Sequence, residues 1–129
     1  LDQIGAVIQG RPKGFAVLSG DDSLTLAVMA LGGEGVISVV SNEAPAEMAS
    51  LVDAAADSDL DQARRLHYRL LPLMHANFVE SNPVPVKEAM ALLGHAPAAV
   101  RPPLGPISET SRRRVRQALE AAGLRVTTS

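Results

Sequence analysis

Two short apolar runs constrain the fold of this chain more than any other feature. They occupy residues 15–18 (FAVL) and 36–40 (VISVV), and glycine or serine bounds each of them. Such runs are typical of strands that are buried on both faces of a parallel sheet. Between them, an apolar face at helical spacing is carried by Leu24, Val28 and Leu31. A strand, a helix and a second strand in direct succession predict a βαβ unit, in which the two strands run parallel.

Two parallel strands do not form a stable sheet by themselves, because each needs neighbours along its edges. We therefore expect this chain to be the end of a larger parallel α/β architecture. Both a (β/α)₈ barrel and an open doubly wound sheet fit the pattern. The sequence opens with Leu1 inside a helical pattern that Gly10 and Pro12 end. We interpret this opening as a piece of a longer protein or as a sequence that starts late.

No strand pattern occurs after Asn42, and the rest of the chain predicts helices. Pro45 stands near the start of one helix. Asp59 is expected to cap a longer helix, whose apolar face reaches Phe78. Pro72 lies inside that pattern, so we expect a kink there. The change from strands and helices to helices alone divides the chain into two parts. Residues 1–58 are predicted to form the last βα units, and residues 59–129 a C-terminal helical domain.

Proline and glycine residues separate the predicted helices of the C-terminal segment. Residues 81–85 (SNPVP) predict a break, and residues 86–93 predict a short helix that Gly94 ends. Repeated prolines in residues 95–107 are typical of an extended connection. Ser108 is expected to cap a last helix that stops at Gly123. The buried face of this helix is predicted to carry Val115, Leu119 and Ala122.

Composition narrows the class of protein. The 129 residues are enough for one domain, and 47% of them are hydrophobic although only 2% are aromatic, so the core must be aliphatic. The absence of cysteine excludes disulfides, thiolate metal sites and cysteine nucleophiles. The sequence has no apolar run of about 18 residues and no basic segment before an apolar one, so it predicts neither a membrane span nor a secretory signal. A net charge of −2 argues against a nucleic-acid or anionic-membrane partner.

The motif Ser19-Gly20-Asp21-Asp22 follows the first predicted strand. Ligands of parallel α/β folds bind at the C-terminal ends of strands. A glycine at such a position lets a ligand or another loop approach the backbone. A plain helix cap is the alternative, because aspartate is common there. A divalent metal site at Asp21 and Asp22 would need a third ligand at a suitable spacing, and we find none, so no metal is predicted.

Other candidate motifs indicate structure rather than chemistry. Residues 32–35 (GGEG) lack the spacing and the lysine of a phosphate loop and precede a strand, so they predict a turn. His67 and His75 do not have the four-residue spacing of a zinc-binding helix, and we interpret both as partly buried helix residues. The arginines within residues 112–116 have no aromatic partners and indicate a solvated or subunit-contacting face.

Neither lysine is placed for Schiff-base chemistry. In a barrel, a Schiff-base lysine reaches the pocket from the C-terminal end of a strand. Lys13 precedes the first predicted strand, and Lys87 lies in a predicted helix outside the βα units. We therefore expect both lysines to be surface charges.

Three segments resemble the dihydrodipicolinate synthase family. They are residues 15–40 (FAVLSGDDSLTLAVMALGGEGVISVV), 78–94 (FVESNPVPVKEAMALLG) and 100–123. The resemblance as a whole extends in order over nearly the whole chain. The SGDD, GGxGVISV and NPxPVK stretches favour this family over N-acetylneuraminate lyase and the keto-deoxy-sugar aldolases, which share its barrel. The resemblance implies a (β/α)₈ TIM barrel followed by a helical C-terminal domain, with this chain as the last part.

The resemblance also implies an activity. The protein is expected to be a cytoplasmic 4-hydroxy-tetrahydrodipicolinate synthase that condenses pyruvate with aspartate semialdehyde, needs no cofactor, and forms a homotetramer. In this family a lysine of the sixth strand holds pyruvate as a Schiff base, and a tyrosine oriented by a threonine pair relays protons. All of these residues would lie upstream of Leu1, and Tyr68 does not match the tyrosine. This chain is therefore expected to carry no catalytic residue and to be inactive alone.

Two positions match residues of the family's substrate pocket. Ile37 matches the isoleucine at the end of the eighth strand, whose backbone lines the pyruvate pocket, and Gly20 matches a glycine at the pocket mouth. Asp21 fits as a neighbour at the entrance. Two other hypotheses stay open: another pyruvate-dependent aldolase of the N-acetylneuraminate lyase superfamily, or a non-catalytic oligomerisation module that has lost the chemistry.

Overall fold

The computed structural model describes residues 1–127, and its N-terminal part contains the predicted βαβ unit. The helix α1 (Asp2–Gly10) leads to the strand β1 (Leu18–Ser19). A 3-10 turn, η1 (Asp22–Leu24), opens into α2 (Thr25–Ala30), and β2 (Gly35–Val36) follows. β2 pairs with β1 in parallel, so the C-terminal ends of both strands meet at one edge of the pair.

The strands are shorter and more exposed than the sequence predicts. β1 and β2 have two residues each, whereas the apolar runs predict strands over residues 15–18 and 36–40. Leu18 is 45% exposed and Ile37 is 70% exposed, so the expectation of burial on both faces is wrong for this chain. The reason is that each strand has one partner here, and a strand is covered on both faces only when neighbouring strands and helices surround it.

The glycine run after α2 forms the predicted turn. Gly32 has a φ of 99°, and a Cβ atom on Gly33 would lie 2.5 Å from Cγ1 of Val28, so side chains do not fit this return to the strand. Arg11 braces the turn by donating to Gly32 O at 2.9 Å and by pairing with Glu34 at 3.3 Å. The interpretation of this run as a turn is confirmed for residues 32–34, and Gly35 begins β2.

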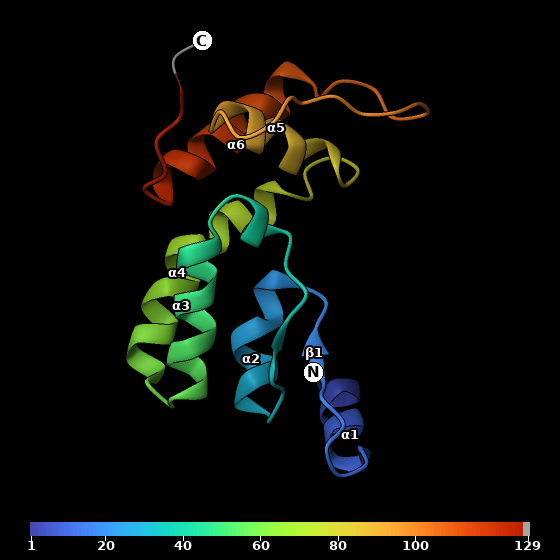
Figure 1. Cartoon of the computed structure of the whole chain (residues 1–129), viewed down its shortest axis with the longest axis vertical. Coiled ribbons are helices and arrows are strands. Elements are labelled where there is room, and N and C mark those ends of the chain that lie inside the picture. Colours follow the sequence, from blue (N-terminus) through green and yellow to red (C-terminus); the bar gives the residue numbers. More distant parts are fainter. Residues whose placement is uncertain (128–129) are drawn as a thin grey trace.

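The chain after β2 is helical apart from its connections (Figure 1). A short 3-10 turn, η2 (Val40–Asn42), precedes α3 (Pro45–Ala56), α4 (Leu60–Ala76), α5 (Val84–Leu92) and α6 (Glu109–Ala121). α3 and α4 lie side by side as a hairpin, and α6 packs against α4 and α5 (Figure 1). Residues 95–107 contain no helix or strand, as the prolines predict. None of the helices within residues 1–127 combines the length and the apolar character that a membrane crossing needs.

Polar side chains cap two helices where the sequence predicts caps. The Asp59 carboxylate accepts a hydrogen bond from Gln62 N at 3.0 Å, and the Ser108 hydroxyl accepts one from Ser111 N at 3.3 Å. These bonds satisfy N–H groups that have no partner inside the helix. α6 ends shortly before Gly123, whose φ of 83° suits a helix stop.

Two expectations for α4 and α5 are wrong. Phe78, predicted on the apolar face of α4, lies beyond the end of that helix and is 54% exposed. α4 ends at Ala76, so Phe78 lies in the turn that follows the helix, where its side chain is exposed. α5 begins at Val84, inside the predicted break, since Pro85 fits a first helical turn, where no N–H partner is needed.

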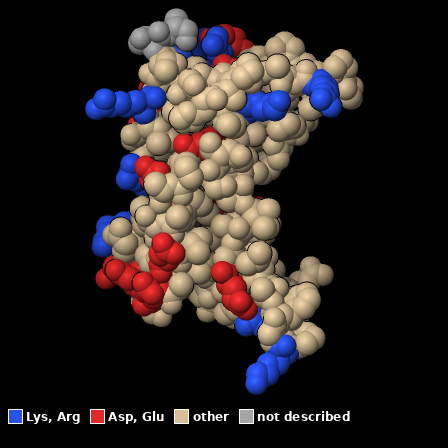
Figure 2. Space-filling model, viewed as in Figure 1, with Lys and Arg blue, Asp and Glu red and all other residues tan. Residues whose placement is uncertain are grey.

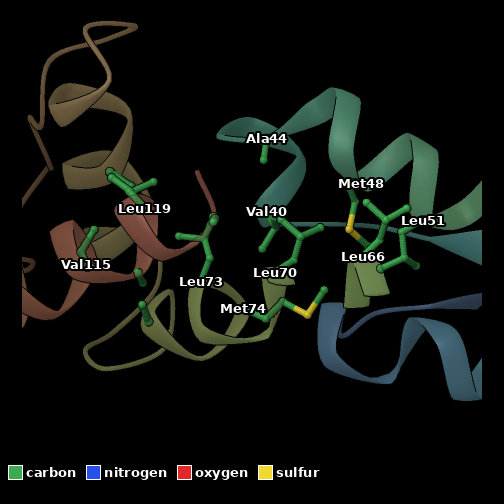
Figure 3. Close-up of a cluster of buried hydrophobic side chains, with 14 of the residues drawn as sticks. Val40, Ala44, Met48, Leu51, Leu66, Leu70, Leu73, Met74, Val115 and Leu119 are labelled. Atoms are coloured by element: carbon green, nitrogen blue, oxygen red, sulfur yellow. The ribbon is translucent and has the colours of Figure 1, made fainter. Parts of the chain in front are cut away.

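The core lies mainly within the helical region and is built from aliphatic side chains, as the composition predicts. Figure 3 shows side chains from η2, α3, α4 and α6 in one cluster. Its largest fully buried members include Leu51, Leu70, Leu73, Met74, Val115 and Leu119. Burial of each such side chain contributes roughly 1.5–3 kcal/mol. Pro72 lies inside α4 without ending it, and the kink there stays a prediction.

The exposed apolar side chains predict that residues 1–129 self-associate or fail to fold when produced alone. Most of them lie in the N-terminal part: Leu1, Val7, Phe15, Leu18, Leu24, Leu31 and Ile37. Free strand edges and exposed apolar side chains bind one another in water. Size-exclusion chromatography with light scattering measures the association.

The control for this prediction compares two exposed positions. Leu18→Lys, at the strand edge, is expected to reduce association more than Phe78→Lys, which lies away from the strands. A monodisperse monomer with a cooperative melt would contradict the prediction.

Candidate functional site

The C-terminal ends of β1 and β2 bring together the predicted site residues Gly20 and Ile37. Ile37 N donates to Ser19 O at 2.8 Å, which extends the strand ladder by one bond. Gly20 directly follows this acceptor, and both predicted site residues are exposed. Ligands of parallel α/β folds bind at this edge. The structure therefore brings the two positions together, while their contact with a substrate stays a prediction.

Asp21 is the N-cap of η1. Its Oδ1 accepts from Ser23 N at 2.8 Å and from the Ser23 hydroxyl at 2.7 Å. These bonds are those of the plain helix cap that the sequence analysis held as the alternative. The role of Asp21 at a substrate entrance stays a prediction.

Gly20 and Asp21 also line a groove between α1 and the βα unit. The groove has a volume of about 410 Å³, and its walls include the apolar side chains of Ile4 and Val7 from α1. Ile37 is not one of its lining residues. The predicted site residues thus share a strand edge but not one groove.

Asp22 is the residue at this edge whose role sequence reasoning missed. It is 2% exposed, and its Oδ2 accepts from Val39 N at 2.9 Å and from Val40 N at 3.1 Å. These bonds tie the loop after β1 to η2, the turn that follows β2. The second aspartate of the SGDD motif was the available signal, but it does not reveal a partner 17 positions further along the chain.

Glu43 and Asn77 form a second buried polar contact that the sequence analysis missed. Glu43 is 3% exposed, and its Oε2 accepts from Asn77 Nδ2 at 3.0 Å. Burial raises the pKa of Glu43 to about 8; the hydrogen bond from Asn77 lowers it, and the negative charge of Asp22 raises it further. The contact joins the segment after η2 to the end of α4. No motif signals it, because the two residues are 34 positions apart.

The other titratable candidates lie away from the strand ends. Lys13 precedes β1 at the opposite end of the strand, and Lys87 lies in α5, where it donates to Ala99 O. His67 is partly buried, which lowers its pKa, and the charge of His75 lowers it further. His75 itself is exposed, so the interpretation of both as partly buried is wrong for this residue. Eight positions along α4 rotate the side chain by about 80°, away from the packed face.

The arginines at the start of α6 lie on an exposed surface, as predicted. Arg112, Arg113 and Arg114 are exposed, and Arg112 pairs with Glu88 of α5 at 2.7 Å. Figure 2 shows basic side chains spread over the molecular face in view rather than gathered in one patch. Within residues 1–127, no group of three or more His, Cys, Asp or Glu side chains is arranged to hold a metal ion.

A parallel strand edge followed by helices fits a (β/α)₈-barrel protein at its C-terminal end, with a helical extension. The model of the Dihydrodipicolinate synthetase family matches residues 1–122, and the chain belongs to this family. The resemblance and the fold class that the sequence predicts are therefore confirmed.

Individual relatives agree with the family match. The 4-hydroxy-tetrahydrodipicolinate synthase of Thermomicrobium roseum is 51% identical over 119 residues, which are 92% of this chain and 39% of that protein. The crystal structure of dihydrodipicolinate synthase from Aquifex aeolicus matches 98% of this chain and 43% of its own, with a TM-score of 0.93 and 41% identity. The chloride-inhibited enzyme of Acinetobacter baumannii, complexed with pyruvate, matches 95% of this chain and 42% of its own, with a TM-score of 0.90 and 37% identity. The chain thus spans about two fifths of the length of these proteins.

Two neighbouring aspartates give a prediction about stability. Asp22→Ala leaves two backbone N–H groups without their acceptor and is expected to cost about 2–6 kcal/mol, since each unpaired buried donor costs about 1–3 kcal/mol. Asp21→Ala removes an exposed cap and is expected to cost about 0.5–2 kcal/mol. Urea unfolding, in a form of the protein that unfolds reversibly, measures both. Equal costs would show that the bonds of Asp22 do not hold η2 in place.

Proposed function

We propose that this chain is the C-terminal portion of a 4-hydroxy-tetrahydrodipicolinate synthase. In this proposal the full-length protein condenses pyruvate with aspartate semialdehyde, a step toward diaminopimelate and lysine. The observation that carries the proposal is the family match over residues 1–122, in order and over nearly the whole chain. The pyruvate complex of the Acinetobacter baumannii enzyme supports pyruvate as the first substrate.

The proposed chemistry starts on a lysine upstream of Leu1. Its amine attacks the C2 carbonyl of pyruvate, and loss of water leaves an imine, the Schiff base. A tyrosine, also upstream, relays protons, and neither a metal nor a cofactor takes part. This chain contributes part of the pocket: the backbone of Ile37, Gly20 at the mouth and Asp21 at the entrance. The hydrogen bond from Ile37 N to Ser19 O supports this assignment, because it holds these positions at the ends of parallel strands.

The N-terminal part of the chain offers a surface for the rest of a barrel. Leu18 and Ile37 are exposed, and an apolar groove runs between α1 and β1. Strands of a barrel need a hydrogen-bonded neighbour on each edge and side chains packed in the interior. We propose that upstream strands cover this surface, and that residues 1–58 belong to the barrel and residues 59–129 to the helical domain. A homotetramer and a cytoplasmic location complete the proposal and rest on the family resemblance.

Schiff-base trapping tests where the chemistry resides. Residues 1–129 alone, incubated with pyruvate and borohydride, are expected to form no adduct, because neither Lys13 nor Lys87 lies at the C-terminal end of a strand. The full-length protein is expected to gain one pyruvate adduct per chain, and peptide mass spectrometry should place it upstream of Leu1. A stoichiometric adduct on Lys13 or Lys87 would overturn the proposal.

Turnover of the full-length protein with different aldehydes separates the alternatives. Condensation with aspartate semialdehyde is the expected result. An adduct followed by turnover only with another aldehyde would indicate a different aldolase of the same superfamily. A full-length protein that forms no adduct would indicate the non-catalytic module.

Two substitutions of Ile37 test its placement at the pocket. Ile37→Val removes one methylene and is expected to cost about 0.5–1.5 kcal/mol of stability, with a modest kinetic effect. Ile37→Pro removes the N–H that donates to Ser19 O and restricts the preceding residue, so it is expected to disrupt both the strand and pyruvate binding. Thermal melts and the pyruvate KM of the full-length protein are the measurements. A proline variant that folds and binds pyruvate normally would show that Ile37 is not at the pocket.

A further inference from the structure

A buried polar cluster lies where the strand-end loops meet the helical region. Asp22 of η1, Glu43 after η2 and Asn77 at the end of α4 are 2%, 3% and 0% exposed. Each has one buried side-chain oxygen that accepts no hydrogen bond: Asp22 Oδ1, Glu43 Oε1 and Asn77 Oδ1. Buried polar atoms in folded proteins nearly always have a partner. The cluster therefore needs a donor that the fixed N–H groups around it do not supply.

The bonds within the cluster indicate which group holds the extra proton. Asp22 Oδ2 accepts from two backbone N–H groups, those of Val39 and Val40, which stabilise its charged form. Glu43 accepts one bond, from the neutral amide of Asn77. Of two carboxyl groups that share a buried site, the one with the weaker stabilisation of its charge takes the proton. That group is Glu43.

The charged side chains on the surrounding elements are engaged elsewhere. Glu47 of α3 pairs with Arg69 of α4 at 4.0 Å, and Glu88 of α5 pairs with Arg112 of α6 at 2.7 Å. Lys87 of α5 donates to the carbonyl of Ala99, and His75 of α4 is exposed. Within residues 1–127, the charge that acts on Glu43 is that of Asp22, which raises the pKa of Glu43 in addition to the larger effect of burial.

A proton fits the cluster better than a metal ion. In the part of the chain that the structure describes, no group of three or more His, Cys, Asp or Glu side chains could hold a metal ion, and a bound ion would need such ligands. A proton on Glu43 Oε1 needs none. It also converts one of the three unpaired oxygens into a donor.

We propose that Glu43 is protonated at neutral pH, so that no second negative charge lies buried where the strand-end loops meet the end of α4. Asp22 holds the loop after β1 to η2, and the bond between Glu43 and Asn77 joins the segment after η2 to α4. Loss of the proton leaves two negative charges in this buried region, and the contact between the loops and α4 weakens. The device is a pH-sensitive link between the candidate site edge and the helical region. It does not depend on the proposed function.

The direction of the pH effect follows from the two states of Glu43. Burial raises the pKa of this carboxyl to about 8 in the folded protein, from its ordinary value of 4.5. Between these values the folded state holds one more proton than the unfolded state. The stability that this proton gives is fully present below the lower value and is lost as the pH rises toward 8. In that window the unfolding constant rises by up to about tenfold per pH unit.

The test compares the unfolding of the full-length protein with that of its Glu43→Gln variant from pH 5 to pH 9. Glutamine keeps an acceptor for Asn77 and an N–H donor in place of the O–H, but it has no proton to lose. The ratio of the wild-type to the variant unfolding constant is expected to rise up to pH 8 and to level off above it. Glu120→Gln, at an exposed position of α6, is the matched control and should follow the wild type. Parallel curves for wild type and Glu43→Gln would overturn the proposal.

A second measurement decides the matter if the glutamine variant does not fold. Carbon-13 NMR of wild-type protein labelled at the glutamate carboxyl carbons should show one carboxyl that titrates near pH 8. Asp22→Asn is expected to lower that midpoint, because it removes the negative charge beside Glu43. If no glutamate titrates in this range, the proposal is wrong. Neither measurement uses enzymatic activity, so its failure is distinct from failure of the proposed function.

Discussion

The two hydrogen bonds that Asp22 accepts from Val39 and Val40 hold the ends of β1 and β2 in one arrangement. The strand pair itself is too short to do so, because only two residues of each strand are paired. The same bonds fix η2, and η2 places Val40, a fully buried core residue, against the helical region. A carboxylate that bonds two backbone N–H groups is a strong anchor, since the N–H of Val40 is buried and that of Val39 partly buried, and without it both lose this acceptor. The position of the strand ends and the start of the helical core therefore depend on one side chain.

One part of the chain has a buried core, and the other part exposes its apolar side chains. The helices from α3 onward surround an aliphatic core, whereas the strand pair and α1 expose large apolar side chains. This asymmetry agrees with a family member that spans about two fifths of the length of its relatives. A barrel strand acquires its burial from neighbours on each side, so the N-terminal surface of this chain is the place where the remaining strands of such a barrel would pack.

Local signals were predicted well and contacts distant in sequence were not. The caps at Asp59 and Ser108 and the turn at residues 32–34 depend on bonds or conformations within a few positions, so composition and spacing reveal them. The bond between Asn77, after the end of α4, and Glu43 joins residues 34 positions apart, and no local signal predicts it. For the same reason, Gly20 and Ile37 could be assigned to strand ends from the sequence, but the role of Asp22 between them could not.

The sequence by itself determined the parallel βαβ order, the helices that follow, the aliphatic core and the family resemblance. Each of these depends on hydrophobic periodicity, on turn residues or on contiguous motifs, which can be identified in the sequence alone. Tertiary structure decided which polar groups meet inside. It buried Asp22, Glu43 and Asn77 together and left Ile37 exposed. Burial and ionisation are properties of a site and its neighbours, since the cost of a charge depends on the surrounding dielectric and on the donors within reach. The order of residues along the chain does not predict the distances between such groups in the folded protein.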